Sequence, residues 1–489
     1  MSTAIDRTDS FKDEKYLDPT PGAVDAIAEE IDPVAERKLL RKLDLHIAPV
    51  MCMIFLLAYI DRSNIGNAST AGLIADCGLV GNEYNTVVTL FYVTYVAFEV
   101  PLTVLLKKFR PSRLITGLVV GWGIVIVCTG FANSYASLIV LRLLLGAFES
   151  GLFPCLALYL SSFYRRKEQA RRVAYLFVAS ALSGAFGGLL AYGILRIDGG
   201  GRKPWQWLFI IEGIITVVFG LSIPWLLPDD FESARYLTHA DKELMRLRQR
   251  VESIYVGNQH FEWSKVRAAY SDYKLWINCF AQFGSNVLSF GFSTFLPNII
   301  RAFGFDVVTT QVLTVPIYFW AAAVYITASI ISDKIGRRII FMIPLASVTL
   351  IGYIILIIPS ITSQGVRVFA LLLQATGIYS MVGLNIVLLT NSQAPYFKRA
   401  TAIGTQQMIG NCAGFVAGQI FLTTDAPRYY LGAKVSLAFT CFCMCLYLTQ
   451  YLIFTRLNAK REKMSTEEKE RLIAEGADGD AHPDFRYPQ

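Results

Sequence analysis

The chain has 489 residues, of which 54% are hydrophobic and 17% are charged, and its formal net charge is +7. Soluble proteins carry roughly 25% charged residues, so this composition excludes an ordinary soluble protein and indicates a membrane protein. The basic residues stand in short clusters between long apolar runs, which is typical of membrane orientation. No nucleic-acid partner is therefore expected.

Long apolar runs divide the chain. A helix needs about 20 apolar residues to cross a bilayer. Twelve runs are long enough, at residues 47–67, 84–106, 114–132, 136–161, 173–196, 206–227, 274–300, 310–332, 338–359, 366–392, 399–422 and 432–456. They predict an all-α membrane protein with twelve transmembrane helices.

Lys and Arg in the loops predict the orientation. One set of loops holds fourteen basic residues, including Lys107 and Lys108, and the opposite set holds seven. Because cytosolic loops carry the excess of positive charge, both termini and the long central loop are expected in the cytosol.

The central loop divides the spans six and six. A cytosolic segment at 1–45 is expected to contain a short amphipathic helix, 32–45, that lies along the inner membrane surface. The first six-helix half covers 46–227. The central loop covers 228–273 and contains a helix that begins near Thr238. The second half covers 274–456, and a largely disordered cytosolic tail covers 457–489.

Few ionisable residues lie well inside the spans. They are Asp61, Arg62, Glu99, Arg142, Glu149 and Glu212. Asp61 and Arg62 are adjacent, and two charges in hydrocarbon cost several kcal/mol. Arg142 and Glu149 are seven residues apart, so they share one helix face about 10 Å apart along the axis. Gly146 leaves space between them, and Pro154 is expected to bend the same helix.

These charges indicate uptake of an anion coupled to protons. An arginine that faces a cavity suits a carboxylate, and a carboxylic acid in a low-dielectric site can hold a proton near neutral pH. The alternative is that buried ion pairs only fix the positions of the helices. For Glu99 that alternative is a pair that closes a loop, and for Glu212 it is interfacial or structural pairing.

Polar side chains that could complete a pocket occur in both halves. They are Tyr59, Tyr92 and Tyr95 in the first half and Gln282, Asn286, Asn385, Asn391, Gln407 and Asn411 in the second. Each could instead form an interhelical hydrogen bond. Glycines four apart, at 184 and 188 and at 410, 414 and 418, predict close helix packing, with a rocking surface as the alternative.

The sequence contains no Ser/His/Asp set and no phosphate-binding loop, so neither an enzyme nor a cofactor is expected. Eight of the nine cysteines lie in apolar runs, where packing explains them, and no metal site is expected. Transport energy would then come from an ion or substrate gradient.

Several motifs resemble a known family. SIISDKIGRR at 329–338 resembles the loop signature of the major facilitator superfamily. LDLHIAP at 43–49 and YIDRSNIGNA at 59–68 resemble the anion:cation symporter family, closest to its fungal allantoate permease-like branch. LKKFRPSR at 106–113 and HPDFRY at 482–487 resemble the same branch. The resemblance covers nearly the whole chain and implies a fold of two six-helix halves.

The resemblance also implies a function. It implies a monomeric plasma-membrane symporter, with an intracellular membrane as the alternative, that imports a small organic anion together with protons. Nicotinate, pantothenate and allantoate are examples of the expected monocarboxylate. By resemblance, Asp61 and Glu149 are the proton-handling acids, Arg142 faces the substrate, Arg62 links the two acids, and Tyr59 and Gln282 match pocket positions. An efflux carrier for an acidic secondary metabolite and a nutrient receptor that transports little remain as alternatives.

Overall fold

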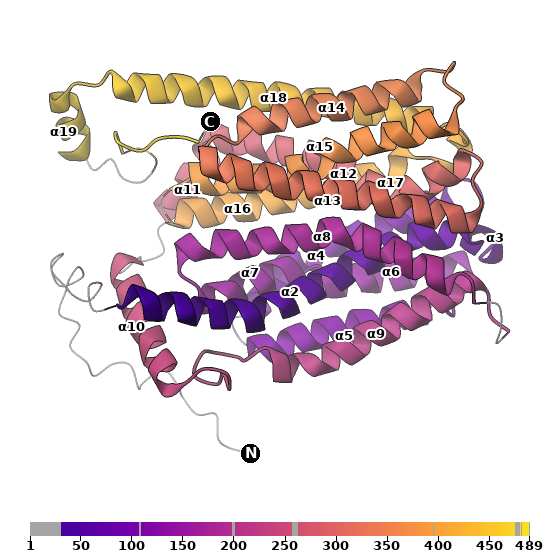
Figure 1. The fold of residues 1–489 in the computed structure, drawn as a ribbon, viewed down its shortest axis with the longest axis horizontal. Helices are drawn as coiled ribbons and strands as arrows, with labels where there is room; N and C mark the ends of the chain where they lie inside the picture. Colours follow the sequence, from indigo (N-terminus) through magenta and orange to yellow (C-terminus); the bar gives the residue numbers. More distant parts are fainter. Residues whose placement is uncertain are drawn as a thin grey trace.

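Long helices run side by side along one axis of the molecule (Figure 1). The computed structural model describes residues 31–106, 109–197, 201–256, 263–394, 396–474, 480 and 482–488, and no strand occurs among them. Nine helical stretches of this described part are long and apolar enough to cross a membrane. Helix α4, helix α12 and the pair α16–α17 run beside them, which gives the twelve predicted spans.

The first six spans occupy the N-terminal half. They are α2 (Pro33–Thr70), α4 (Glu83–Leu106), α5 (Pro111–Thr129), α6 (Tyr135–Glu149) continued by α7 (Leu152–Phe163), α8 (Arg166–Ile194) and α9 (Pro204–Leu226). The short helix α3 (Leu73–Asp76) follows α2. It marks one end of the bundle, which we call the α3 end.

The other six spans form the C-terminal half. They are α12 (Tyr273–Ala302), α13 (Val307–Ile335), α14 (Ile339–Ile357), α15 (Gln364–Ser392), α16 (Tyr396–Asn411) continued by α17 (Ala413–Ile420), and α18 (Tyr430–Glu462). A 3-10 turn, η1 (Thr423–Asp425), precedes α18. The central loop contains α10 (His239–Val256) and α11 (Trp263–Ser271), and α10 marks the opposite end, the α10 end (Figure 1).

Helix α10 begins where the sequence predicts. The backbone N–H of Asp241 donates to the Thr238 hydroxyl at 3.3 Å, and the N–H of Thr238 donates to the Asp241 carboxylate at 3.0 Å. This reciprocal capping satisfies N–H groups that a helix start leaves without partners. The same carboxylate accepts from Lys42 at 2.6 Å, which ties α10 to α2.

The predicted surface helix at 32–45 is not a separate element, so that prediction is wrong. Residues 33–70 form one 38-residue helix, α2, whose start is capped by the Asp32 carboxylate. At about 1.5 Å per residue it is about 57 Å long, which exceeds the ~30 Å hydrocarbon core. Leu39 and Leu43 are fully buried, and Asp44 pairs with Arg172 at 2.7 Å. The amphipathic face therefore packs on protein and extends the first span.

The fourth span, which carries Arg142 and Glu149, is interrupted just after Glu149. Helix α6 ends at Glu149 and α7 begins at Leu152. Pro154 has no N–H, and its ring conflicts with the carbonyl four residues earlier, which belongs to Ser150. The break therefore lies one turn before the proline, and it leaves Glu149 at a helix end.

Glycines bring the two halves into contact. Helices α2 and α12, α4 and α17, and α8 and α13 meet across the interface. A Cβ on Gly66 of α2 would overlap the carbonyl oxygen of Thr294 on α12. Four of the predicted packing glycines also face the other half: Gly184 faces Tyr318, Gly188 faces Thr314, Gly414 faces Tyr92 and Gly418 faces Thr89. Their close packing therefore lies on the surface where the halves meet.

Hydrogen bonds close the two halves together at the α3 end. The Asn85 amide of α4 donates to the backbone carbonyls of Gly418 and Phe421 at 2.8 and 2.9 Å. The Ser69 hydroxyl at the end of α2 donates to Asn298 of α12 at 2.7 Å. These contacts fix the closed arrangement that the glycines permit.

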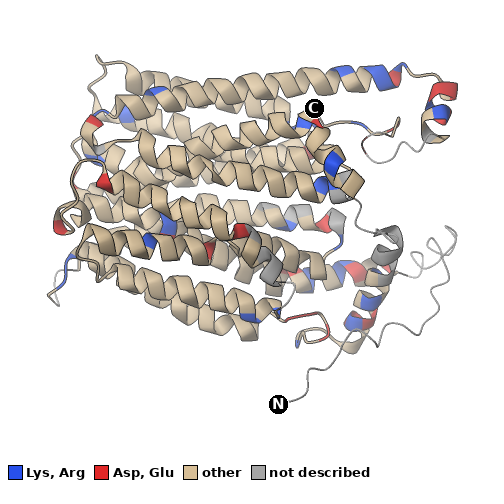
Figure 2. Cartoon of the chain, turned by 180° about the vertical axis from the view of Figure 1, so that it is seen from behind, with Lys and Arg blue, Asp and Glu red and all other residues tan. Residues whose placement is uncertain are grey.

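Charged residues gather at both ends of the bundle, and only a few lie along its length (Figure 2). Lys107 and Lys108, which contribute to the predicted orientation, lie outside the described residues. The sidedness of the chain is therefore a prediction from the loop charges.

The C-terminal tail is ordered in its described part, so the prediction of a largely disordered tail is wrong there. Helix α18 continues to Glu462, and α19 covers Thr466–Ala474. Tyr487 is 4% exposed and stacks on Phe454 with ring centroids 4.9 Å apart. Its backbone bonds both ends of the Asn458 amide at 2.9 Å. Tyr487, close to the C-terminus, therefore packs on α18.

Four charges hold the tail to the bundle. Lys398 lies 2.7 Å from Asp480 and 2.9 Å from Asp272, and Lys274 lies 3.3 Å from Asp480. Burial raises the pKa of Asp272, but Lys274 and Lys398 outweigh burial and hold that pKa below its usual value. A lowered pKa means that the cluster contributes stability above about pH 3.9 and loses it as the pH falls through the folded-state value.

We expect Tyr487→Ala to lower the apparent melting temperature of the detergent-solubilised protein by roughly 4 °C or more. It removes the stacked ring and a hydroxyl that lies 2.6 Å from Lys274. Arg486→Ala is the matched control, because that neighbour is exposed. Equal melting temperatures for the two variants would contradict the docking of the tail.

We expect Gly66→Ala to prevent closure at the α3 end and to lower transport about tenfold or more, because even a methyl group conflicts with the α12 backbone. Gly193→Ala is the control, since nothing lies within 4 Å of a Cβ there. Labelling of a Thr310→Cys reporter measures opening and should rise only in the Gly66 variant, because Thr310 is buried near the start of α13 and its hydroxyl has no hydrogen-bond partner among the described residues. Unchanged labelling and transport would refute the close-approach argument.

Candidate functional site

Two adjoining pockets lie between the halves, and we call them together the central hollow. Both are lined by Tyr59, Phe177, Gln407 and Asn411. The free volume of each is about 30 Å³, which is room for water, so a substrate would enter only after the two halves move apart. The N-terminal half contributes Arg62 and aromatic rings, whereas the C-terminal half contributes amides, including Gln282. A ligand here would contact both halves.

Arg62 is the arginine that the structure places in the lining of the hollow. One of its terminal nitrogens donates to Glu149 at 3.1 Å, and the two side chains are 10% and 0% exposed. Its guanidinium carbon lies 4.9–5.0 Å from the ring centroids of Tyr59, Phe91 and Tyr95. Cation–π attraction and the ion pair together stabilise a charge that burial would otherwise oppose.

Asp61 faces away from its neighbour Arg62, because adjacent residues on a helix point about 100° apart. Asp61 is fully buried between α2, α5 and α9. Its Oδ2 accepts from the Trp122 indole at 3.1 Å and from the Thr216 hydroxyl at 3.3 Å. Its Oδ1 has no hydrogen-bond partner among the described residues. The adjacent charges of the sequence thus serve two different sites.

Arg142 and Glu149 share a helix, but they do not pair. Glu149 bonds Arg62, and Arg142 lines neither pocket of the hollow. Arg142 is 3% exposed, and one of its terminal nitrogens has no hydrogen-bond partner in the described part of the chain. Its charge acts on both Asp61 and Glu149. Arg142 therefore lies outside the lining of the hollow and within electrostatic range of both acids.

A network of amides forms the C-terminal side of the hollow. Gln282 accepts from the Asn385 amide at 2.8 Å and donates to Asn286 at 3.2 Å. Asn278 donates to Asn385 at 2.9 Å and accepts from Gln406. Gln282 and Asn286 line the hollow, so the network holds uncharged donors and acceptors in place at its C-terminal wall.

Two members of this network, Asn278 and Gln406, were not predicted from the sequence. The available signal was spacing, because Asn278, Gln282 and Asn286 are four apart on one helix face. Asn391, which the sequence suggested, is exposed and lies outside the hollow. The aromatic residue Phe91 was also missed, since nothing in the sequence separates a ring that contacts Arg62 from core packing.

The other buried acids have partners that the sequence did not predict. Glu99 accepts from Asn411 of α16 at 3.1 Å and so bridges the two halves. Glu212 is 2% exposed and accepts from the Asn64 amide of α2. It lies inside the N-terminal half, not at its interface with the membrane.

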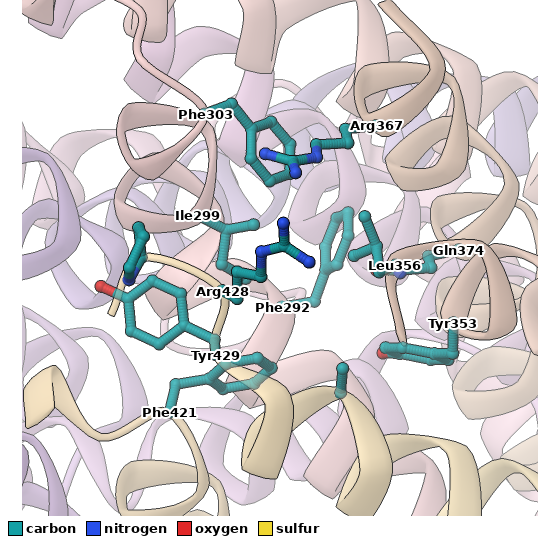
Figure 3. Close-up of a pocket in the computed structure, with 12 residues that line it drawn as sticks. Phe292, Ile299, Phe303, Tyr353, Leu356, Arg367, Gln374, Phe421, Arg428 and Tyr429 are labelled. Carbon is teal, nitrogen blue, oxygen red and sulfur yellow. The ribbon is translucent and has the colours of Figure 1, made fainter. Parts of the chain in front are cut away.

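A separate pocket, with about 20 Å³ of free volume, lies in the C-terminal half near the α3 end. Figure 3 shows the Arg428 guanidinium directed into it among aromatic rings. Arg428 donates to the Pro359 carbonyl at 2.9 Å, and Arg367 donates to the Ile361 carbonyl at 3.0 Å. These arginines hold loops to the bundle, and the residues that line this pocket all come from the C-terminal half. The central hollow, which both halves line, is therefore the better candidate site.

Comparisons with known proteins place the chain. The model of the major facilitator superfamily matches residues 51–418. An uncharacterized transporter of Schizosaccharomyces pombe is 40% identical, over 92% of this chain and 90% of the relative. A high-affinity nicotinic acid transporter of Saccharomyces cerevisiae is 37% identical, over 99% of this chain and 90% of the relative.

Solved structures share the fold at low identity. The crystal structure of a D-xylose–proton symporter has a TM-score of 0.63 and 12% identity, and the match covers 83% of this chain and 97% of that one. An inward-facing bacterial homologue of the lysosomal transporter Spinster also has a TM-score of 0.63, with 13% identity over 86% of this chain and 97% of that one. The predicted twelve-helix fold is thereby confirmed, and the chain belongs to the major facilitator superfamily of membrane transporters.

Proposed function

We propose that this transporter is a proton-coupled symporter that imports a small organic monocarboxylate, and that it belongs to the allantoate permease-like branch of the anion:cation symporter family. The observation that carries the proposal is the buried ion pair of Arg62 and Glu149 at the wall of the hollow. A carboxylate substrate and Glu149 would compete for one guanidinium, and competition of this kind couples anion binding to protonation.

The coupling follows from the cost of buried charge. While Glu149 is ionised, it neutralises Arg62, and a second carboxylate entering the hollow would bring an unpaired negative charge. Protonation of Glu149 removes its charge and leaves Arg62 free to hold the substrate carboxylate. The aromatic rings around Arg62 would cover the body of the substrate, and Gln282 and its amide network would bind its polar atoms.

Asp61 would hold a second proton. It shares the electrostatic field of Arg142 with Glu149, so a change of charge on one acid alters the other. Arg142 would stabilise the ionised form of both acids after proton release, without contacting the substrate in this arrangement. This assignment gives Arg62 the substrate contact that the sequence resemblance gave to Arg142.

The cycle requires the two halves to rock around the hollow. We place the α10 end, with both termini, the central loop and the tail, in the cytosol of a plasma-membrane protein, as the loop charges favour. Opening at the α3 end would admit protons and anion, and opening at the α10 end would release them. One chain forms the entire hollow, so a monomer suffices.

Nicotinate is the first substrate to test. The Saccharomyces cerevisiae relative is named a high-affinity nicotinic acid transporter, and it aligns with almost the whole of this chain. A flat aromatic acid also suits a pocket that combines Arg62 with tyrosine and phenylalanine rings. Pantothenate and allantoate complete the panel.

The decisive measurement is uptake by the purified protein in proteoliposomes. We expect accumulation of labelled nicotinate, or another acid of the panel, that rises when the outside is acidified. Asp61→Asn and Glu149→Gln should each abolish acid-driven accumulation while sparing binding or exchange, because neither variant can release a proton. Normal pH dependence in both variants would refute the assignment.

The same vesicles separate the alternatives. Outward flux that rises with internal substrate, without acid-driven uptake, would indicate efflux. Binding without flux in either direction would indicate a receptor.

We expect Arg62→Lys to raise the KM for the anion about tenfold or more, since an ammonium group loses the planar fork and the stacking on three rings. Arg367→Lys is the control, because Arg367 lies in the pocket near the α3 end. Concentration-dependent uptake by both variants measures the effect. An unchanged KM in the Arg62 variant would exclude it as the carboxylate contact.

A further inference from the structure

Glu212 is a buried acid that the proposed cycle does not use. It lies on α9, inside the N-terminal half, and two hydrogen bonds cross between α9 and α2 around it. Thr216 of α9 donates to Asp61 of α2, and Asn64 of α2 donates to Glu212 of α9. Asp61 and Asn64 are three residues apart, and Glu212 and Thr216 are four apart, so each pair spans about one helical turn. The crossing therefore places the two carboxyl groups about one turn from each other.

Glu212 has no positive partner in the described part of the chain. It is 2% exposed, its Oε2 accepts from the neutral Asn64 amide, and its Oε1 has no hydrogen-bond partner there. Glu149 differs, because it is paired with Arg62. An isolated carboxylate is far more costly to bury than a neutral carboxylic acid. Glu212 therefore carries a proton in this arrangement.

The surrounding groups leave Asp61 as its only ionisable neighbour among the residues described. The charge that acts on Glu212 is that of Asp61 on α2, and Asp61 is in turn within range of Glu149 and Arg142 of α6. The α5 and α9 side chains that contact Asp61 are neutral, namely Trp122 and Thr216. Two acids this close in a low-dielectric site resist simultaneous ionisation, so a proton taken up by the pair is shared between them.

Glu212 lies closer to the α3 end than Asp61 does. Helix α9 begins at that end, where Trp205 donates to Asp76 of α3 at 2.7 Å. Glu212 follows Trp205 by two turns. On α2, Asn67 lies one turn nearer to the α3 end than Asn64 and donates to it at 3.4 Å. Polar groups therefore continue from Glu212 toward the end that the loop charges predict to be outside.

We infer that Glu212 is the acid that receives protons from the α3 end and delivers them to Asp61. In the step, the protonated Glu212 releases H⁺ from its carboxyl group, and the Asp61 carboxylate accepts it at Oδ1, the oxygen for which the described residues provide no hydrogen-bond partner. Asp61 becomes neutral and Glu212 becomes a carboxylate. Glu212 then takes up a new proton from the α3 end. Because the two carboxyl groups lie about one helical turn apart, the transfer would pass through a water molecule between them.

This inference rests on the proposed function, since it assigns the origin of the proton that Asp61 holds. A purely structural acid would make a different prediction. If Glu212 only fills space and bonds Asn64 as a permanently neutral acid, glutamine reproduces its shape and its acceptor oxygen. Glu212→Gln therefore separates a relay, which must lose and regain a proton, from a fixed hydrogen-bond partner.

The experiment uses the full chain in proteoliposomes that contain a pH-sensitive dye. The acid of the panel that the wild type transports is supplied outside. With Glu212→Gln, acid-driven accumulation and the associated proton influx should fall about tenfold or more, while substrate exchange at equal pH stays within about twofold of wild type. Glu212→Asp, which keeps the acid but moves it by one methylene, should restore part of the proton influx.

Each outcome decides the inference. Normal proton influx in Glu212→Gln, with a coupled wild type, overturns the relay and leaves the proposed function intact. A wild type that carries the anion without proton influx overturns both. If Glu212→Gln also loses exchange, Glu212→Asp decides: slowed proton influx with normal exchange supports the relay, and unchanged influx overturns it.

Discussion

The ion pair of Arg62 and Glu149 is the interaction on which the arrangement of the site depends. Two charges buried in a membrane protein must be paired, and here the partners come from α2 and from the broken end of α6. The rings of Tyr59 and Tyr95 stabilise the positive charge of Arg62 further through cation–π contacts. The pair therefore holds α2 and α6 together and also places Arg62 in the lining of the central hollow. Any group that neutralises Glu149 changes what Arg62 can bind.

The two halves contribute different chemistry to the hollow. All charges near it come from the N-terminal half in the part of the chain described, whereas the C-terminal half supplies a network of neutral amides around Gln282. A ligand that needs both sides must hold the halves together. Close glycine contacts such as Gly66 against Thr294 allow the halves to meet, and Asn85 joins them at the α3 end. Binding and movement thus use the same interface.

Much of the fold could be predicted from hydrophobic runs, because the bilayer requires helices of a minimum length. Two features could not be predicted in this way: the continuity of α2 across residues 33–70 and the ordered tail. Helix α2 is continuous because its amphipathic face packs on protein, and Tyr487 is ordered because it stacks on Phe454, contacts that no local pattern reveals. In the site, the rarity of buried charge identified Arg62, Arg142 and both acids, but the spacing along the chain could not show which arginine pairs with Glu149.

The sequence by itself determined the class of protein, the twelve spans and which charged residues need an explanation. Those results follow from the cost of placing charge and unpaired backbone in hydrocarbon, which is a local property of the chain. Only the tertiary structure decided which charges meet. Asp61 and Arg62 are neighbours in sequence, yet one faces Trp122 and the other Glu149, because helix geometry turns them apart and the partners come from distant helices.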